Sequence, residues 1–478
     1  MAADPTREMT DPSSSPPRPP KPPAPKLADV MVRPFARFME LEVSSAILLL
    51  AMAVLALVWA NSPWGHTYDA FWHTPFGLKL GDVFHLELSL AHWVNDGLMA
   101  IFFFTVGMEI KREMAYGELS SRDRAMLPLF GALGGMIVPA GIYVFLHAGG
   151  PAIRGWGVPM ATDIAFAVAA LSVMGSRVPS SLRIFLLALA IADDLGAVAV
   201  IAVFYTAEIH LSSLAWAGAG LGLCVILNLI GVRSFFVYAL LGAFVWFETH
   251  HSGVHATIAG VLLGFVTPHT VDRDDHETLI DRGRGALDHL RELMRGVRET
   301  PESVDHSGHE RHHATRELAA LARQSLSPLD FLVNVLERPV AFVVMPIFAL
   351  ANAGVVLDTS TLGDPMALRV ASAVALGLVV GKPLGVSLFA WIAVRTRIAA
   401  MPSGVNWGML VATGVLAGIG FTVALFVTAL AFDDPVHAAG SKIGILLGSV
   451  IATAAGLVTL ARSLPPAPPR RSTDLGHS

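Results

Sequence analysis

The chain has little charge and almost no cysteine. Charged residues make up 15% of its 478 residues and hydrophobic residues 54%, whereas soluble domains are about 25% charged. With a mean hydropathy of +0.59, this composition excludes an ordinary soluble protein and predicts a polytopic membrane protein. The single cysteine, Cys224, excludes an intramolecular disulfide. The net charge of −5 is modest and gives no information about nucleic acid; we expect no nucleic-acid partner for a membrane protein.

The first thirty residues lack the apolar segment and the small-residue cleavage site of a secretory signal. We therefore expect no cleaved leader, and we interpret residues 1–32 as a disordered, Pro-rich cytoplasmic tail. The apolar segments that follow predict about twelve transmembrane helices. The predicted spans lie near residues 43–60, 93–110, 126–147, 156–176, 182–206, 211–230, 235–248, 252–266, 339–356, 370–394, 405–432 and 441–461.

Lys and Arg are concentrated in alternate loops between these spans. Because loops rich in Lys and Arg stay in the cytoplasm, this asymmetry predicts an even number of crossings with both termini cytoplasmic. The membrane domain is then predicted to comprise residues 33–266, with eight helices, and residues 331–463, with four, before a cytoplasmic tail at 464–478. The other set of loops contains only Lys79, Arg154, Arg369 and Lys442.

Two segments between the spans do not look membrane-embedded. Residues 77–90 alternate apolar and polar side chains around Gly81-Asp82, which predicts a β-hairpin on the outer face. We interpret it as the contact of a homodimer, with a lid as the alternative. Residues 267–330 are rich in charge and histidine and have apolar residues at helical spacing, which predicts a cytoplasmic helical insertion. Its run HSGHERHH at 306–313 could bind a metal, but a solvated loop is the favoured interpretation.

Asp193 and Asp194 lie in the middle of an apolar segment, residues 182–204, that is long enough to cross a bilayer. Each charge there costs about 2.5 to 3.5 kcal/mol, whereas each Leu, Ile, Val or Phe contributes about 0.3 to 0.6 kcal/mol in favour of insertion. The 13 such residues of this segment therefore roughly offset the two carboxylates. The helix must lie inside a bundle with its carboxylates facing a partner or a cavity, which is typical of an ion or proton path.

Two other spans contain helix-breaking residues. Thr162 and Asp163 follow a stretch rich in Gly and Pro, so we expect a break at which Asp163 neutralises the positive end of a half-helix and Thr162 offers a hydroxyl oxygen. Paired interruptions in the two halves of a chain indicate a secondary transporter. In the second half, three glycines predict the matching break, with close helix packing as the alternative: Gly414, Gly418 and Gly420.

Lys382 lies about midway along the span at 370–394. An unpaired ammonium at that depth is costly, so we expect a carboxylate partner. Successive residues of a helix point about 100° apart, so Asp193 and Asp194 cannot both address one small site. We expect one to face Lys382 and the other to face the cavity.

Seven segments of the sequence form a specific set: NDGLMAIFFFTVGMEIKRE (95–113), MATDIAFA (160–167), ALAIADDLGAVAVIA (188–202), SGVHATIAGVLLGF (252–265), FALANAGV (348–355), GKPLG (381–385) and GIGFT (418–422). In order and spacing, over residues 35–265 and 335–460, they resemble the NhaA-type sodium/proton antiporters. The resemblance implies an all-α fold of twelve helices with an inverted repeat and two interrupted, crossing helices. It implies a transporter that is no enzyme and needs no cofactor; antiporters of this type are among the proteins known to have paired interrupted helices.

The resemblance also implies a function and a location. It implies electrogenic export of Na⁺ or Li⁺ from the cytoplasm in exchange for external protons, across a bacterial inner membrane and under pH regulation. Asp194 is implied as the carboxylate shared by cation and proton, with Asp193 paired to Lys382. Asp163 is implied to balance the helix ends and contribute to the site with Thr162. Carboxylate, hydroxyl and carbonyl oxygens suit a hard cation such as Na⁺.

Regulation by pH is implied by residues that match the family's pH-responsive positions. His255 matches one of them, with a purely structural histidine as an equal alternative. The chain departs from the family near the ninth span, where Asn334 replaces a frequent acidic residue and Glu337 follows three residues later. The insertion before it is also atypical. The implied cluster at the inner mouth is Glu109, Arg112 and Glu113.

Two other function classes use acidic residues within membrane helices. An intramembrane aspartyl protease requires GxGD and PAL signatures, which this sequence lacks, and gives Lys382 no role. A transporter that couples Na⁺ or H⁺ to an organic solute would share the broken helices, but no further polar cluster for such a solute is evident. Cation-dependent proton movement without an organic solute distinguishes exchange from this last alternative.

Overall fold

The computed structural model describes residues 42–80, 84–206, 209–232, 234–269, 327–357 and 363–465, with six single positions between 285 and 316. The chain divides into two compact units, Met1–Leu41 and Glu42–Ser478, of which the first lies outside the described residues. The predicted tail at 1–32, the run at 306–313 and residues 466–478 of the second tail also lie outside them. So does almost all of the predicted insertion.

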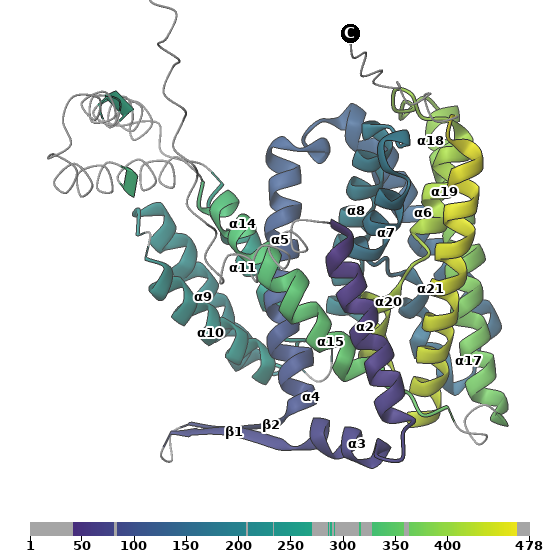
Figure 1. The fold of residues 1–478 in the computed structure, drawn as a ribbon. Helices are drawn as coiled ribbons and strands as arrows, with labels where there is room; N and C mark the ends of the chain where they lie inside the picture. The colour runs from purple at the N-terminus through teal and green to yellow at the C-terminus, as the bar shows by residue number, and fades with distance from the viewer. Residues whose placement is uncertain are drawn as a thin grey trace, which may run out of the picture. The chain divides into compact units, whose positions relative to one another are not determined.

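The described part of the chain is almost entirely helical (Figure 1). Helices satisfy their own backbone hydrogen bonds, as a lipid environment requires. The longer helices are α2 (Glu42–Ala60), α5 (Met99–Tyr116), α6 (Arg122–Leu146), α8 (Ser180–Phe204), α9 (Leu211–Leu229), α10 (Phe235–His251), α14 (Pro328–Pro339), α17 (Pro365–Leu376), α18 (Lys382–Arg395) and α21 (Pro435–Ser463). The shorter ones are α3 (Gly65–His73), α4 (Leu90–His92), α7 (Ile164–Val173), α11 (Thr257–Val266), α15 (Met345–Asn352), α19 (Trp407–Leu416) and α20 (Phe421–Ala431).

Six further turns extend or join these helices. A 3₁₀ segment, η3 (Pro151–Met160), precedes α7. Three π-helical turns make continuous rods of α4 with α5, α14 with α15, and α17 with α18; such turns are rare and frequently lie at functional sites. The π turns are η1 (Trp93–Leu98), η6 (Val340–Val344) and η7 (Gly377–Gly381), and short 3₁₀ turns are η2 (Glu118–Ser120) and η4 (Gly175–Arg177).

Eight helices of the described chain are long and apolar enough to cross a membrane, and up to ten if each of two bent helix pairs counts as one span. Helices α10, with 17 residues, and α11, with 10, occupy the two remaining predicted positions. The prediction of an all-α polytopic membrane protein is therefore confirmed. The total of twelve spans stays a prediction.

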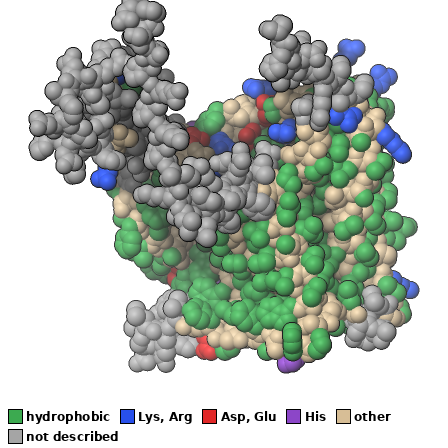
Figure 2. Space-filling view, viewed as in Figure 1, with side chains coloured by type: hydrophobic (Ala, Val, Ile, Leu, Met, Phe, Trp, Pro, Cys, Tyr) green, Lys and Arg blue, Asp and Glu red, His purple; other side chains and the backbone are tan. Residues whose placement is uncertain are grey.

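Large apolar side chains cover the surface of the helices. Figure 2 shows them over the middle of one face, with Lys and Arg mainly along the rim away from the hairpin. Val58 is 61% exposed, Phe145 83% and Val450 66%. A soluble protein rarely exposes such a continuous apolar surface, whereas in a bilayer these side chains contact lipid.

Two antiparallel strands, β1 (Pro75–Leu80) and β2 (Phe84–Ser89), lie between α3 and α4. Their register runs from Pro75 opposite Ser89 to Leu80 opposite Phe84. The strands thus begin two residues before the predicted segment at 77–90 and end one residue before its end.

Two triplets of spans have the same order, in which a long helix, a broken helix and a long helix follow one another. The first triplet is α6, η3 with α7, and α8; the second is α17 with α18, α19 with α20, and α21. Helix α5 runs away from the hairpin, so α6, which follows α5, begins at the end far from the hairpin. Helix α17 begins at the hairpin end (Figure 1). The triplets run in opposite directions, as an inverted repeat requires.

The helices pack mainly in two groups. We call the two triplets the broken-helix group. The supporting group contains α2, α3, α5, α9, α10, α11, α14 and α15, in which α5 packs on α11, α9 on α10 and α15 on α2. The groups meet along α2 and α7, α5 and α8, and α15 and α20.

Candidate ion site

The two broken spans meet at their breaks. Segments η3 and α7 are bent by 43° around residues 161–163, and α19 and α20 by 47° around residues 417–420. The backbone N–H of Asp163 donates to the carbonyl of Ile419 at 2.6 Å. Four half-helix ends therefore come together inside the broken-helix group.

Asp163 lies at the N-terminal ends of both α7 and α20. One of its carboxyl oxygens accepts the Phe166 backbone N–H at 3.2 Å, and the other accepts the Thr422 N–H at 3.1 Å and the Thr422 hydroxyl. N-terminal helix ends have free N–H groups and a partial positive charge. One carboxylate, 2% exposed, therefore stabilises two helix ends, where the sequence predicted one.

Donor groups face the opposite helix ends, which are partially negative. The ammonium of Lys382 donates to the carbonyl of Met160, the last residue of η3. The hydroxyl of Thr162 lies 2.8 Å from the carbonyl of Ala417, which caps α19. Lys382 thus compensates the end of η3, whereas the end of α19 shares the single proton of the Thr162 hydroxyl with Asp193.

Asp193 forms a buried ion pair with Lys382. Both side chains are 1% exposed, and the carboxyl oxygen that contacts Lys382 also accepts the Thr162 hydroxyl at 2.5 Å. Burying two charges costs hydration energy that attraction offsets only with good geometry and further hydrogen bonds, which Thr162 and Met160 provide. Lys382 thus has the carboxylate partner that its depth in the membrane predicted.

Asp194 differs from its neighbour. It is 2% exposed, and within the described part of the chain neither of its carboxyl oxygens has a hydrogen-bond partner. A buried polar group without a partner is costly. These two oxygens are therefore available to a proton or a small cation.

The three carboxylates do not form a preformed metal cage. No three His, Cys, Asp or Glu side chains of the described residues are arranged to hold a metal ion. Asp163 is engaged by two helix ends and Asp193 by Lys382. A cation that binds all three would require side chains to rearrange. Among the described contacts, Asp194 has two oxygens without a hydrogen-bond partner and Asp193 has one.

The glycines of the second break satisfy both interpretations of the sequence. A side chain at Gly418 would meet the carbonyl of Leu378, and one at Gly420 would meet the carbonyl of Ala161 at 3.2 Å. Gly414 lies inside α19, three residues before the break, where a side chain would meet Val386 at 3.3 Å. Gly418 and Gly420 therefore lie at the break and are closely packed, whereas Gly414 contributes close packing only.

The predicted inner cluster is assembled at the end of α5. Glu109, Arg112 and Glu113 are all half-buried, and Glu113 accepts the backbone N–H of Glu118 at 2.9 Å. The charges of Arg112, Glu337 and Glu113 act on Glu109. Glu337 comes from α14, which packs on α5, so this acidic residue lies with the cluster although Asn334 departs from the family.

His255 is not part of that cluster. Its Nε2 lies 3.5 Å from a carboxyl oxygen of Asp96, and Nδ1 of His250 lies 3.6 Å from the other oxygen. The sequence analysis missed Asp96, although an acidic residue within an apolar span carries the same cost as the Asp pair. It also assigned no role to Thr422, although Thr422 lies two residues after Gly420 and ends the GIGFT segment.

We expect Thr422→Val to destabilise the helix crossing. The change removes a hydrogen bond to a charged carboxylate, which contributes about 1.5 to 3 kcal/mol. Thr453→Val is the matched control, because the Thr453 hydroxyl bonds only to Ser449 of its own helix among the described contacts. Thermal unfolding in detergent measures both, and equal losses would show that Asp163 does not depend on Thr422.

Comparison with known proteins assigns the family. Residues 36–460, which contain both breaks and the Asp pair, match the family model described as Na+/H+ antiporter 1. The chain is 47% identical over 440 residues to the Na(+)/H(+) antiporter NhaA of Rhodopirellula baltica, covering 91% of this chain and 96% of that protein. It is 46% identical over 433 residues to Na(+)/H(+) antiporter NhaA 2 of Myxococcus xanthus, covering 91% and 90%, and 46% identical over 436 residues to NhaA of Koribacter versatilis, covering 91% and 92%. The chain therefore belongs to the NhaA family of Na⁺/H⁺ antiporters.

Proposed function

We propose that this protein exchanges Na⁺ for protons across a membrane, with Asp194 as the group that binds either ion. The observation that supports this most directly is the buried carboxyl whose two oxygens have no hydrogen-bond partner among the described residues. It lies next to an ion pair and a helix crossing whose charges are already compensated. Family membership supports the same activity.

The proposed exchange follows from the cost of a buried charge. An ionised carboxylate in apolar surroundings is unfavourable, and either a proton or Na⁺ relieves that cost at Asp194. Both bind the same oxygens, so one excludes the other. Ions are then the substrates of a transporter that is no enzyme and needs no cofactor.

Further oxygen atoms lie near the breaks. The Thr162 hydroxyl and the carbonyls of the half-helix ends suit a hard cation, and Li⁺ has the same preference. We infer that Asp193 takes part together with Asp194. More protons than Na⁺ ions then move in each exchange, so the exchange is electrogenic.

Dye-monitored proton movement in proteoliposomes tests the proposal. Na⁺ and Li⁺ should release protons without any organic solute, K⁺ should not, and an imposed membrane potential should change the rate. Proton movement that requires an organic solute would instead favour the coupled transporter. No cation response at all would refute the exchange.

We propose a bacterial inner-membrane location with both termini cytoplasmic. The rim rich in Lys and Arg, opposite the hairpin (Figure 2), is then the cytoplasmic one, and the hairpin faces outward. Reporter fusions at each terminus test the orientation.

We also propose that the hairpin joins two copies of the protein. Deleting residues 77–90 should then convert a dimer to a monomer, as measured by light scattering.

We expect Glu109→Gln to shift the pH at which activity is half-maximal by about half a unit or more, because it removes one charge from a cluster of interacting groups. The maximal rate should stay similar, since Glu109 does not contact Asp194. Activity is measured across pH in proteoliposomes. A variant that lacks residues 270–327 is measured in the same way. If this deletion shifts the curve of activity against pH and Glu109→Gln does not, the inner cluster is not the pH sensor.

A further inference from the structure

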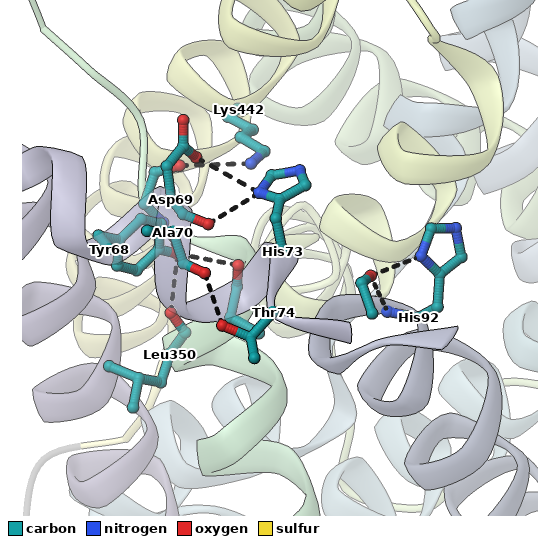
Figure 3. Close-up of polar contacts among 11 residues, drawn as sticks. Tyr68, Asp69, Ala70, His73, Thr74, His92, Leu350 and Lys442 are labelled. Carbon is teal, nitrogen blue, oxygen red and sulfur yellow. Dashed lines mark hydrogen bonds and ion pairs between the residues drawn. The ribbon is translucent and has the colours of Figure 1, made fainter. Parts of the chain in front are cut away.

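The segment at 348–355, FALANAGV, has no part in the ion chemistry, yet side chains of three helices converge on its end. The Tyr68 hydroxyl of α3 lies 2.8 Å from the carbonyls of both Leu350 and Ala351 and accepts the Gly354 N–H at 3.3 Å. Figure 3 shows Tyr68 between Leu350 and the neighbourhood of Lys442. Hydrogen bonds of Tyr68 therefore hold the C-terminal end of α15 against α3.

A second set of hydrogen bonds holds the chain just after Gly354 against the end of α2. Asn61, directly after α2, donates to the Val355 carbonyl at 2.8 Å and accepts the Leu357 N–H at 2.7 Å. A side chain at position 354 would collide with the ring of Tyr68, so only glycine fits. The Gly354 carbonyl is thus held at a fixed place by the supporting group.

Lys442 reaches this carbonyl from the broken-helix group. Its ammonium, on α21, donates to the Gly354 oxygen at 3.3 Å. The hydrogen bonds of the ion site described above stay within the broken-helix group, and those of Tyr68 and Asn61 stay within the supporting group. Lys442 connects the two.

Helix α21 also contacts the ion site. Ser449 lies seven residues after Lys442 and therefore on the same face of the helix. Its hydroxyl accepts the backbone N–H of Phe421 at 3.3 Å, and Phe421 begins α20, directly before the Thr422 that binds Asp163. Helix α21 thus contacts both the Gly354 carbonyl and the start of α20 at the crossing.

We propose that the contact of Lys442 with Gly354 is a latch between the two helix groups, closed in this structure. It opens when the groups shift to expose Asp194 toward the hairpin side. A contact of 3.3 Å made by a flexible lysine to a backbone carbonyl held in place can break and re-form. This role rests on the proposed exchange, because only a transporter must open alternately to two sides.

The test compares Lys442→Met with Lys442→Arg, which keeps the charge, and with Arg369→Met, a matched control at an exposed site on α17. Amide hydrogen exchange at residues 350–357 should accelerate about tenfold or more in Lys442→Met and stay unchanged in the other two variants, because only Lys442→Met loses a hydrogen bond from a charged donor. The apparent KM for Na⁺ supplied at the hairpin side should fall by a similar factor, because more molecules are open to that side.

Unchanged hydrogen exchange in Lys442→Met, or an equal change in the Arg369 control, overturns the latch. If Lys442→Met does not fold, Tyr68→Phe loosens the same carbonyl from the other side, and it should accelerate exchange at residues 350–357 equally. Hydrogen exchange needs no transport activity. If the wild-type protein shows no cation-driven proton movement, the proposed function is refuted. Hydrogen exchange still shows whether Lys442 holds residues 350–357 in place.

Discussion

Asp194→Asn is expected to reduce cation-driven proton movement to the level of empty liposomes. Asparagine has nearly the same shape but neither ionises nor releases a proton in the working pH range, so it can exchange no charge. Because neither carboxyl oxygen of Asp194 has a described partner to lose, stability should change by no more than about 1 kcal/mol. Proteoliposome flux and thermal unfolding in detergent measure the two effects.

Asp123→Asn is the matched control for this prediction. Asp123 lies in the exposed first turn of α6, and the same substitution there should leave transport unchanged. Flux near the wild-type level in Asp194→Asn would remove Asp194 from the mechanism. A large loss of stability would show instead that its carboxylate has a structural partner.

The division of labour between the two aspartates followed from elementary rules. The energetic cost of two charges in an apolar segment placed both inside a bundle, and the rotation of about 100° per residue separated their directions. The cost of Lys382 required a carboxylate. The structure brings Asp193 and Lys382 together, but which aspartate takes the lysine was implied by the family resemblance and not by these rules.

The second half of the crossing could not be inferred from local sequence. Asp163 and Thr422 are 259 residues apart in the chain, and nothing near either residue indicates that the two breaks face each other. Helix-breaking residues predict where a helix ends, but the partner of that end depends on packing. The same limit applies to His255, whose neighbour Asp96 comes from a distant span.

Lys382→Met is expected to destabilise the protein by about 3 to 5 kcal/mol, because it leaves Asp193 as a buried charge without its partner. The carbonyl of Met160 loses its donor as well. Adding Asp193→Asn removes the stranded charge, so the double variant should regain most of this loss. Unfolding of both single variants and the double variant measures the coupling between the two residues.

Lys111→Met is the control for this cycle. Lys111 donates to the carbonyls of Phe265 at 2.7 Å and Thr267 at 2.5 Å, so its loss removes hydrogen bonds to uncharged groups only. Its cost should be smaller, and Asp193→Asn should not rescue it. If the double variant proves no more stable than Lys382→Met alone, the ion pair does not hold these helices together.

The double variant also tests the role of Asp193 in transport. If the double variant still exchanges ions, the rate should respond less to membrane potential, because one of the two proposed proton-carrying carboxyls is gone.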